Sequence, residues 1–195
     1  MRPLFTLGHS NHGIDPFLDL LAGQGVTVLA DVRSHPASRF APHFSKERLR
    51  ASLAAVGIGY LWLGEGFGAR PKDPACYEGG IARHALIAAH PAFALARAAV
   101  VEAAEAGATV CLMCAERDPL GCHRTALVSR RLRADFPDIR HIHGDGTVED
   151  NTSFEARLVA GDRDGAIRDL FADSPVEAAY DRLSAAIGWR PGGNA

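Results

Sequence analysis

Long uncharged apolar stretches are missing from the sequence. The most apolar region, residues 86–108, is interrupted by Pro91, Arg97, Glu102 and Glu105, whereas a membrane-spanning helix needs about 20 consecutive apolar residues. The opening residues, MRPLFTLGHSN, also lack the apolar segment of a secretory signal peptide. These absences predict a cytoplasmic chain that does not cross a membrane.

An excess of one charge is also missing, because 21 Lys and Arg face 23 Asp and Glu. A net charge of −2 excludes a global field that would attract nucleic acid or a membrane, although a local basic patch stays open. Cysteine is scarce, with four residues at 76, 111, 114 and 122. In the cytoplasm these are expected to be reduced thiols, and Cys114 and Cys122 could still form a redox or metal-binding pair.

Short apolar runs alternate with helical patterns along the chain. The predicted strands span residues 4–8, 26–32, 60–63, 109–113 and 139–143. Predicted helices lie between them. Asp15 and Ser45 are the expected N-caps of the first two, and two further helices are expected to begin at Pro91 and Thr125. This alternation predicts a single-domain α/β protein, a three-layer, Rossmann-like sandwich with a mostly parallel open sheet of about five strands and helices on both faces.

Three segments fit this alternation less well. Residues 64–91 are rich in Gly and Pro and show little periodicity, so they are either an active-site lid or an idle surface insertion. Residues 153–186 predict one or two helices with breaks at residues 161–164 and 174–175. Residues 188–195 predict a flexible tail.

Polar side chains follow the predicted strands at their carboxyl ends, which share one edge of a parallel sheet. The opposite edge carries mostly Gly and Ala turns. This asymmetry predicts a binding site at the carboxyl edge. The candidate residues are His9, Ser10, Asn11, Asp31, Arg33, Ser34, Ser38, Arg39, Tyr60, Cys114, Glu116, Cys122, His123 and Arg124.

The arginines of this edge indicate the ligand. Arginine binds phosphate and carboxylate groups through paired hydrogen bonds, so Arg33, Arg39 and Arg124 together predict an anionic ligand. Asp31 and Arg33 are two residues apart in an extended segment and point to the same side. They form either a buried ion pair or a ligand-facing arginine that Asp31 orients.

The cysteines allow several interpretations. Cys122 lies where a helix is predicted to begin, beside His123 and Arg124, a setting that favours a reactive thiolate. It is either a nucleophile or a buried structural thiol. Cys114, Cys122 and His123 could bind a metal with His9 or Glu116, but the seven residues between the cysteines differ from the usual zinc spacings. We therefore expect no metal and no other cofactor.

Five motifs in order resemble the bacterial and archaeal family described as domain of unknown function 488. They read TLGHSN, LADVRSHPASRF, GYLWLGEGFG, LMCAERDPLGCHR and HIHGDG, and they extend from Thr6 to Gly146. The chain departs from the family at residues 66–68, where a turn similar to Leu-Gly-Gly is expected. The resemblance implies a shared site at the carboxyl edge and names no reaction. Labels that link family members to DNA repair or iron–sulfur assembly are weak hints.

Three functions follow from these residues. The first is a hydrolase or lyase, possibly similar to N-glycosidases, acting on an anionic substrate such as a nucleotide, a modified base or a nucleic-acid end. In it, Asp31 or Glu116 would activate water or stabilise positive charge, and His9 and His123 would move protons. The second is a non-catalytic module that binds nucleic acid or an anion. The third is a thiol or metal protein built on Cys114 and Cys122.

Overall fold

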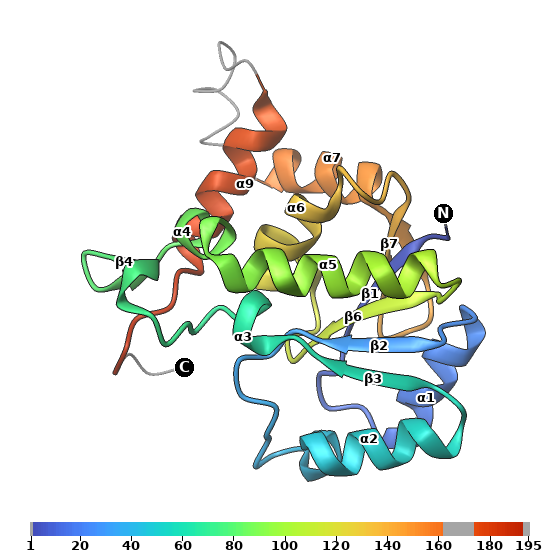
Figure 1. The fold of residues 1–195 in the computed structure, drawn as a ribbon. Coiled ribbons are helices and arrows are strands. Elements are labelled where there is room, and N and C mark those ends of the chain that lie inside the picture. Colours follow the sequence, from blue (N-terminus) through green and yellow to red (C-terminus); the bar gives the residue numbers. More distant parts are fainter. Residues whose placement is uncertain (1, 162–173, 193–195) are drawn as a thin grey trace.

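The computed structural model describes residues 2–161 and 174–192 (Figure 1). A six-stranded sheet runs through its centre in the order β3-β2-β6-β1-β7-β8. Its strands are β1 (Leu4–Gly8), β2 (Val28–Asp31), β3 (Gly59–Trp62), β6 (Val110–Cys114), β7 (Ile139–Ile142) and β8 (Val148–Asp150). The first five are parallel to one another, which confirms the predicted α/β fold with a mostly parallel sheet.

The sixth strand, β8, is not predicted by the sequence. It returns antiparallel beside β7 through a tight turn in which the main-chain nitrogen of His143 donates to the carbonyl oxygen of Thr147 at 2.9 Å. Its only apolar residue, Val148, is exposed. A short edge strand that buries no apolar side chain has no alternation to reveal it.

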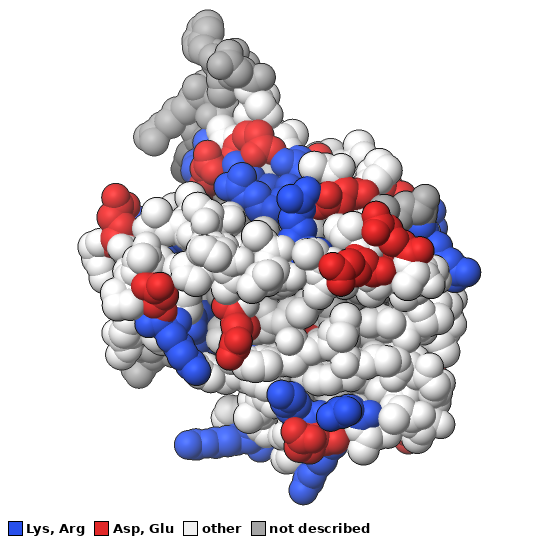
Figure 2. All heavy atoms as spheres, in the orientation of Figure 1, with Lys and Arg blue, Asp and Glu red and all other residues white. Residues whose placement is uncertain are grey.

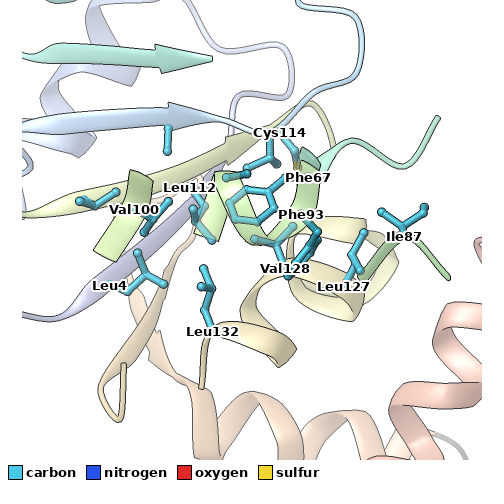
Figure 3. Close-up of a cluster of buried hydrophobic side chains, with 14 of the residues drawn as sticks. Leu4, Phe67, Ile87, Phe93, Val100, Leu112, Cys114, Leu127, Val128 and Leu132 are labelled. Carbon is cyan, nitrogen blue, oxygen red and sulfur yellow. The ribbon is translucent and has the colours of Figure 1, made fainter. Parts of the chain in front are cut away.

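Each face of the sheet is covered by its own helices. In β1, Phe5 and Leu7 belong to the core cluster that contains the buried residues of α1 (Ile14–Gly23) and α2 (Lys46–Ala55). Leu4 belongs to the opposite cluster, which contains the buried residues of α5 (Pro91–Glu105). Figure 1 shows α2 and α5 on opposite sides of the sheet. Figure 3 shows Val100 of α5 beside Leu4 and Leu112 in the second cluster.

The starts of the helices correct two details of the prediction. Helix α1 begins at Ile14 with Gly13 at the N-cap, where Asp15 was expected. Ser45 precedes α2 as expected, but its side chain makes no capping hydrogen bond. Helix α5 begins at Pro91 as predicted, because proline needs no hydrogen-bond partner for its nitrogen at the first helical position.

The segment after β6 departs most from the prediction. A single-turn 3₁₀ helix, η3 (Pro119–Gly121), leads into a π-helix, η4 (Arg124–Ser129), and α6 (Arg130–Leu132) follows. An α-helix was expected over residues 125–134. The hydroxyl of Ser129 donates to the carbonyl oxygen of Arg124 at 2.8 Å, five residues earlier. All six residues of η4 are buried, so the wide turn places consecutive side chains against the protein interior.

Residues 64–91 are more organised than their composition predicts. They form α3 (Gly64–Phe67), η2 (Pro74–Cys76), the hairpin strands β4 (Tyr77–Glu78) and β5 (Ile81–Ala82), and α4 (His84–Ala89). Helix α3 packs so closely on α5 that a Cβ at Gly66 would lie 2.2 Å from the carbonyl oxygen of Ala92. The close approach therefore needs glycine at this position. Another single turn, η1 (Pro42–Phe44), precedes α2.

The C-terminal helices α7 (Asn151–Gly161) and α9 (Pro175–Ala186) pack together through Phe154 and Tyr180. Of the break predicted at residues 161–164, residues 162–164 lie outside the described residues. In the predicted tail, Trp189 accepts a hydrogen bond from the main chain of Ala82 at 2.8 Å, and residues 193–195 lie outside the described residues. In the described part of the chain, no helix combines the length and apolar character needed to cross a bilayer.

Candidate functional site

A pocket of about 310 Å³ opens at the carboxyl edge of the sheet. Loops that follow β1, β2 and β6 contribute its polar lining. Six predicted site residues lie in this lining, namely His9, Arg33, Ser34, Ser38, Glu116 and His123. The carboxyl ends of three parallel strands therefore meet in one pocket, as expected for this class of sheet.

Arg33 is held in place by Asp31. The Nε and Nη2 atoms of Arg33 donate to the two carboxylate oxygens of Asp31 at 2.9 and 2.6 Å. The Tyr60 hydroxyl donates to the same carboxylate at 2.8 Å, and Nη2 of Arg33 also donates to the carbonyl oxygen of Phe44. Asp31 is fully buried while Arg33 lines the pocket. Both readings of this pair therefore apply, because Arg33 is ion-paired and also faces the pocket.

His9 completes this arrangement on the β1 side. Its Nδ1 donates to the carbonyl oxygen of Ser10 at 2.8 Å, because a carbonyl oxygen can only accept. Its Nε2 is therefore the acceptor for Nη1 of Arg33 at 3.2 Å. The imidazole stacks on Phe44 with ring centroids 4.3 Å apart. Burial, aided by the charge of Arg33, lowers the pKa of His9 to about 4, so this imidazole is neutral at physiological pH.

Glu116 presents the negative charge of the pocket. Its Oε2 accepts a hydrogen bond from the Cys122 thiol at 3.2 Å. Desolvation of the carboxylate acts to raise the pKa of Glu116, although the residue as a whole is exposed. The charge of His123 and hydrogen bonds from thiols and the main chain outweigh this effect and lower the pKa to about 2. The carboxylate is therefore ionised throughout the physiological range, and it is a weak base.

The two cysteines of this region lie behind the pocket. Cys114 and Cys122 are fully buried, and their sulfur atoms are 2.7 Å apart as free thiols. Burial raises the pKa of the Cys114 thiol. Neither cysteine lines the pocket, so the nucleophile predicted at Cys122 has no direct access to a ligand there.

Arg124 corrects the prediction most clearly. It was expected to bind phosphate, yet it is fully buried and does not line the pocket. Its Nη1 donates to the carbonyl oxygen of Glu116 at 2.6 Å, and its Nη2 donates to that of Arg117 at 3.1 Å. A Cβ at Gly8 would lie 1.8 Å from the same Glu116 oxygen. Arg124 and the bare main chain of Gly8 thus fix the loop that carries Glu116.

Other predicted residues also lie outside the pocket. Asp31 and Tyr60 stand behind Arg33, which argues against the expectation that Asp31 activates water. Ser10 is half-buried and Asn11 exposed, and their side chains bond to each other at 3.2 Å. Arg39 is exposed and is not part of the lining. Of the three predicted anion-binding arginines, only Arg33 reaches the pocket.

The structure adds residues that the sequence interpretation missed. His35, Arg70 and Trp189 line the pocket, and the Arg70 guanidinium lies over the Trp189 ring at 5.6 Å. The main-chain nitrogen of Arg70 donates to the Ser34 hydroxyl at 2.9 Å. The only sequence signal for Trp189 is that it is one of two tryptophans. Together, Arg70 and Trp189 form a wall with a cationic and an aromatic surface.

One group of side chains in the described ranges could hold a metal ion. Cys114, Glu116 and Cys122 place three ligand atoms within 4.8 Å of one another. His123, which the sequence interpretation included, is not in this group, and its Nε2 lies 3.2 Å from the carbonyl oxygen of Val32.

Comparison with known protein families identifies the family to which the chain belongs. The family model described as "Domain of unknown function DUF488" matches residues 13–131. This match covers more than half of the chain and includes Arg33, Glu116 and His123, while His9 precedes it. No curated protein and no solved structure matches the chain. The chain belongs to the family described as domain of unknown function DUF488.

Proposed function

We propose that this protein is a hydrolase or lyase that acts on an anionic substrate with a planar ring, such as a nucleotide, a modified base or a nucleic-acid end. The observation that carries the proposal is the convergence of Arg33, His9, Glu116 and His123 in one pocket. Within one cavity, the guanidinium can bind an anion, the carboxylate can stabilise positive charge and the His123 imidazole can move protons, while His9 holds the guanidinium in place.

Arg33 is the anion-binding residue of this proposal. Its charge is only partly offset by Asp31, because Nη1 faces His9, and neutral His9 brings no counter-charge. The ion pair with Asp31 fixes the guanidinium before a ligand arrives. A fixed guanidinium spends less side-chain entropy on binding than a mobile one. Arg70 supplies a second cation in the pocket lining, and Trp189 offers a face for a base ring.

Glu116 and His123 are the groups of this proposal that act on the reacting bond. Because Glu116 stays ionised, it is suited to stabilising positive charge that develops when a glycosidic bond breaks. His123 donates through Nε2 to the Val32 carbonyl oxygen, which leaves Nδ1 as the ring nitrogen that can exchange a proton with the substrate. His9 holds Arg33 and the β1 loop in register.

The alternative is a module that binds an anion or nucleic acid without chemistry. On the face seen in Figure 2, Lys and Arg lie interspersed with Asp and Glu and form no continuous basic surface. The same mixing is seen among individual ion pairs, since Arg130 pairs with Glu177 at 2.5 Å and with Asp181 at 2.7 Å. Non-specific nucleic-acid binding relies on many phosphate contacts, so this face favours a small ligand over a long duplex.

The proposal is tested by measuring both binding and turnover. Nucleoside monophosphates, nucleosides with modified bases and short oligonucleotides are titrated by calorimetry and assayed for product by chromatography. We expect Arg33→Gln to weaken binding at least tenfold and Glu116→Gln to lower kcat at least a hundredfold with little change in binding. The matched control is Arg39→Gln, an exposed arginine on the same edge.

Two outcomes would overturn the proposal. Binding by the unaltered protein without turnover of any compound, unchanged in Glu116→Gln, would identify a binding module. Equal effects of Arg33→Gln and Arg39→Gln would show that the pocket is not the anion site.

A further inference from the structure

Cys114, Glu116 and Cys122 form a cluster beside the pocket that has the composition and spacing of a metal site. The sulfur atoms of Cys114 and Cys122 are 2.7 Å apart, and the Cys122 sulfur is 3.2 Å from Oε2 of Glu116. All three ligand atoms lie within 4.8 Å of one another. In a tetrahedral zinc site with Zn–S near 2.3 Å, two sulfur ligands are about 3.8 Å apart. The sulfurs would therefore have to separate by only about 1 Å around the ion.

The charge of Arg124 provides an independent observation. This guanidinium is fully buried, and it bonds to two carbonyl oxygens, the Thr6 hydroxyl and the Cys114 sulfur. Within residues 2–161 and 174–192, no carboxylate forms an ion pair with it. A buried charge without a counter-charge is costly. Two thiolates, the Glu116 carboxylate, a divalent ion and the guanidinium sum to neutrality.

Hydrogen bonds to the two sulfurs also support a metal site. Nη1 of Arg124 donates to the Cys114 sulfur at 2.9 Å, and the main-chain nitrogen of Arg124 donates to the Cys122 sulfur at 3.3 Å. Each sulfur thus accepts an N–H bond from the same residue. Such bonds orient thiolate ligands and stabilise their charge in metal sites.

We propose that Cys114, Glu116 and Cys122 bind one divalent transition-metal ion, of which Zn²⁺ best suits two sulfurs and a carboxylate oxygen. The proposal departs from the expectation of no metal. Of the candidate ligands named from the sequence, it keeps Cys114, Cys122 and Glu116 and leaves out His123. Three protein ligands leave a fourth position on a tetrahedral ion, and one of the three, Glu116, also lines the pocket. Arg124 is a positioning residue that holds both sulfurs.

The site deepens the proposed function while standing on its own geometry. A zinc ion with an open position lowers the pKa of bound water to about 7 and can supply the nucleophile of a hydrolysis. Glu116, which carries negative charge in the proposed reaction, then acts as a ligand of the ion. The inference rests on the proposed function only in this last step.

Metal titration of the whole chain tests the site without any substrate. The protein is purified under reducing conditions, treated with a chelator and titrated with Co²⁺, whose thiolate bonds give a charge-transfer absorption in the near ultraviolet. We expect one equivalent of Co²⁺ to bind and Zn²⁺ to displace it. Cys122→Ser should abolish most of the absorption, and Glu116→Gln should weaken binding at least tenfold. Cys76→Ser, a buried cysteine outside the cluster, is the matched control and should bind normally.

Circular dichroism of each variant separates lost binding from lost folding. Glu116 is exposed, so Glu116→Gln still tests the site if a cysteine variant does not fold. Absence of stoichiometric binding to the reduced protein would overturn the proposal. So would binding that is unchanged in both Cys122→Ser and Glu116→Gln. A Cys114–Cys122 disulfide in protein that binds no metal after reduction would identify a redox pair instead. Because the readout is the ion, lack of turnover would count against the proposed function alone.

Discussion

Arg33 and Arg124 follow neighbouring strands at the same edge of the sheet, yet their environments are opposite. Arg33 has a carboxylate partner, Asp31, and still faces the pocket. Arg124 is more deeply buried, has main-chain carbonyls as partners and does not reach the pocket. The comparison shows that an arginine at this edge can either face the pocket or fix a loop. The hydrogen-bond partners decide which role it has.

Removing Arg124 should have the largest effect. Arg124→Met leaves the buried carbonyl oxygens of Glu116 and Arg117 without their donors, and such losses cost several kcal/mol. We expect the free energy of unfolding to fall by about 4 kcal/mol, as measured by urea denaturation of chelator-treated protein. The exposed Arg131→Met is the control and should cost less than about 0.5 kcal/mol. A loss below about 1 kcal/mol for Arg124→Met would show that the comparison misassigns this arginine.

Breaking the ion pair between Arg33 and Asp31 should cause the next largest loss of stability. Asp31→Asn leaves the buried Arg33 charge without a counter-charge, which should cost about 3 kcal/mol and weaken anion binding by loosening the guanidinium. The control is Asp138→Asn, because the Arg140–Asp138 pair has a similar distance, 2.8 Å, but is half-exposed. Exposed pairs contribute about 0 to 1 kcal/mol. If urea denaturation gave equal losses in the free energy of unfolding for Asp31→Asn and Asp138→Asn, the buried ion pair would contribute no more than the exposed one.

The pH dependence of the free energy of unfolding tests whether His9, the hydrogen-bond partner of Arg33, is neutral in the folded protein. Because the pKa of His9 is lowered to about 4 in the folded state, the unfolded chain takes up this proton first as the pH falls. The stability contributed by neutral His9 is present above its unfolded pKa of about 6.5 and is lost toward about 4. Wild type should therefore lose about 2 kcal/mol more than His9→Asn between about pH 7 and pH 4.5.

The other buried histidines with lowered pKa values, His84 and His141, are present in both proteins and cancel in this difference. Parallel stability curves for wild type and His9→Asn would contradict the assignment of a neutral His9 beside Arg33.

Tyr60→Phe should have the smallest effect of the set. It removes one of the hydrogen bonds that the Asp31 carboxylate accepts while the ion pair with Arg33 remains. We expect a loss of about 1 kcal/mol and a smaller loss of anion affinity than for Asp31→Asn, as measured by urea denaturation and calorimetry. A cost as large as that of Asp31→Asn would mean that the tyrosine, rather than Arg33, is the main partner of the carboxylate.

Much of the fold is readable from the sequence because the buried strands appear as uninterrupted apolar runs. Strand β1 was predicted with its observed bounds, since Leu4–Gly8 is buried on both sides. Strand β8 has no such run, because an exposed edge strand is defined by its hydrogen bonds to β7. The sequence also predicts which loops meet, since parallel strands bring His9, Arg33 and Glu116 to one edge.

The roles within the site could not be predicted in the same way. Residue type does not distinguish Arg33 from Arg124, because burial depends on the helix phase after β6, and no local pattern indicates a π-helix there. Trp189 enters the pocket from the far end of the chain through its contact with Ala82, a tertiary contact without a local signature. The cysteine spacing argued against a metal because it resembles no common motif, whereas the fold itself brings Cys114 and Cys122 together.

The π-helix η4 makes this region sensitive to chain length more than to residue identity. Removing one residue from a helix changes the rotational position of everything beyond it. A one-residue deletion within Arg124–Ser129 would turn either Arg124 away from the Glu116 loop or Leu132 away from the core cluster it joins. Relatives that keep this site should therefore align through the segment without gaps, even where its side chains differ.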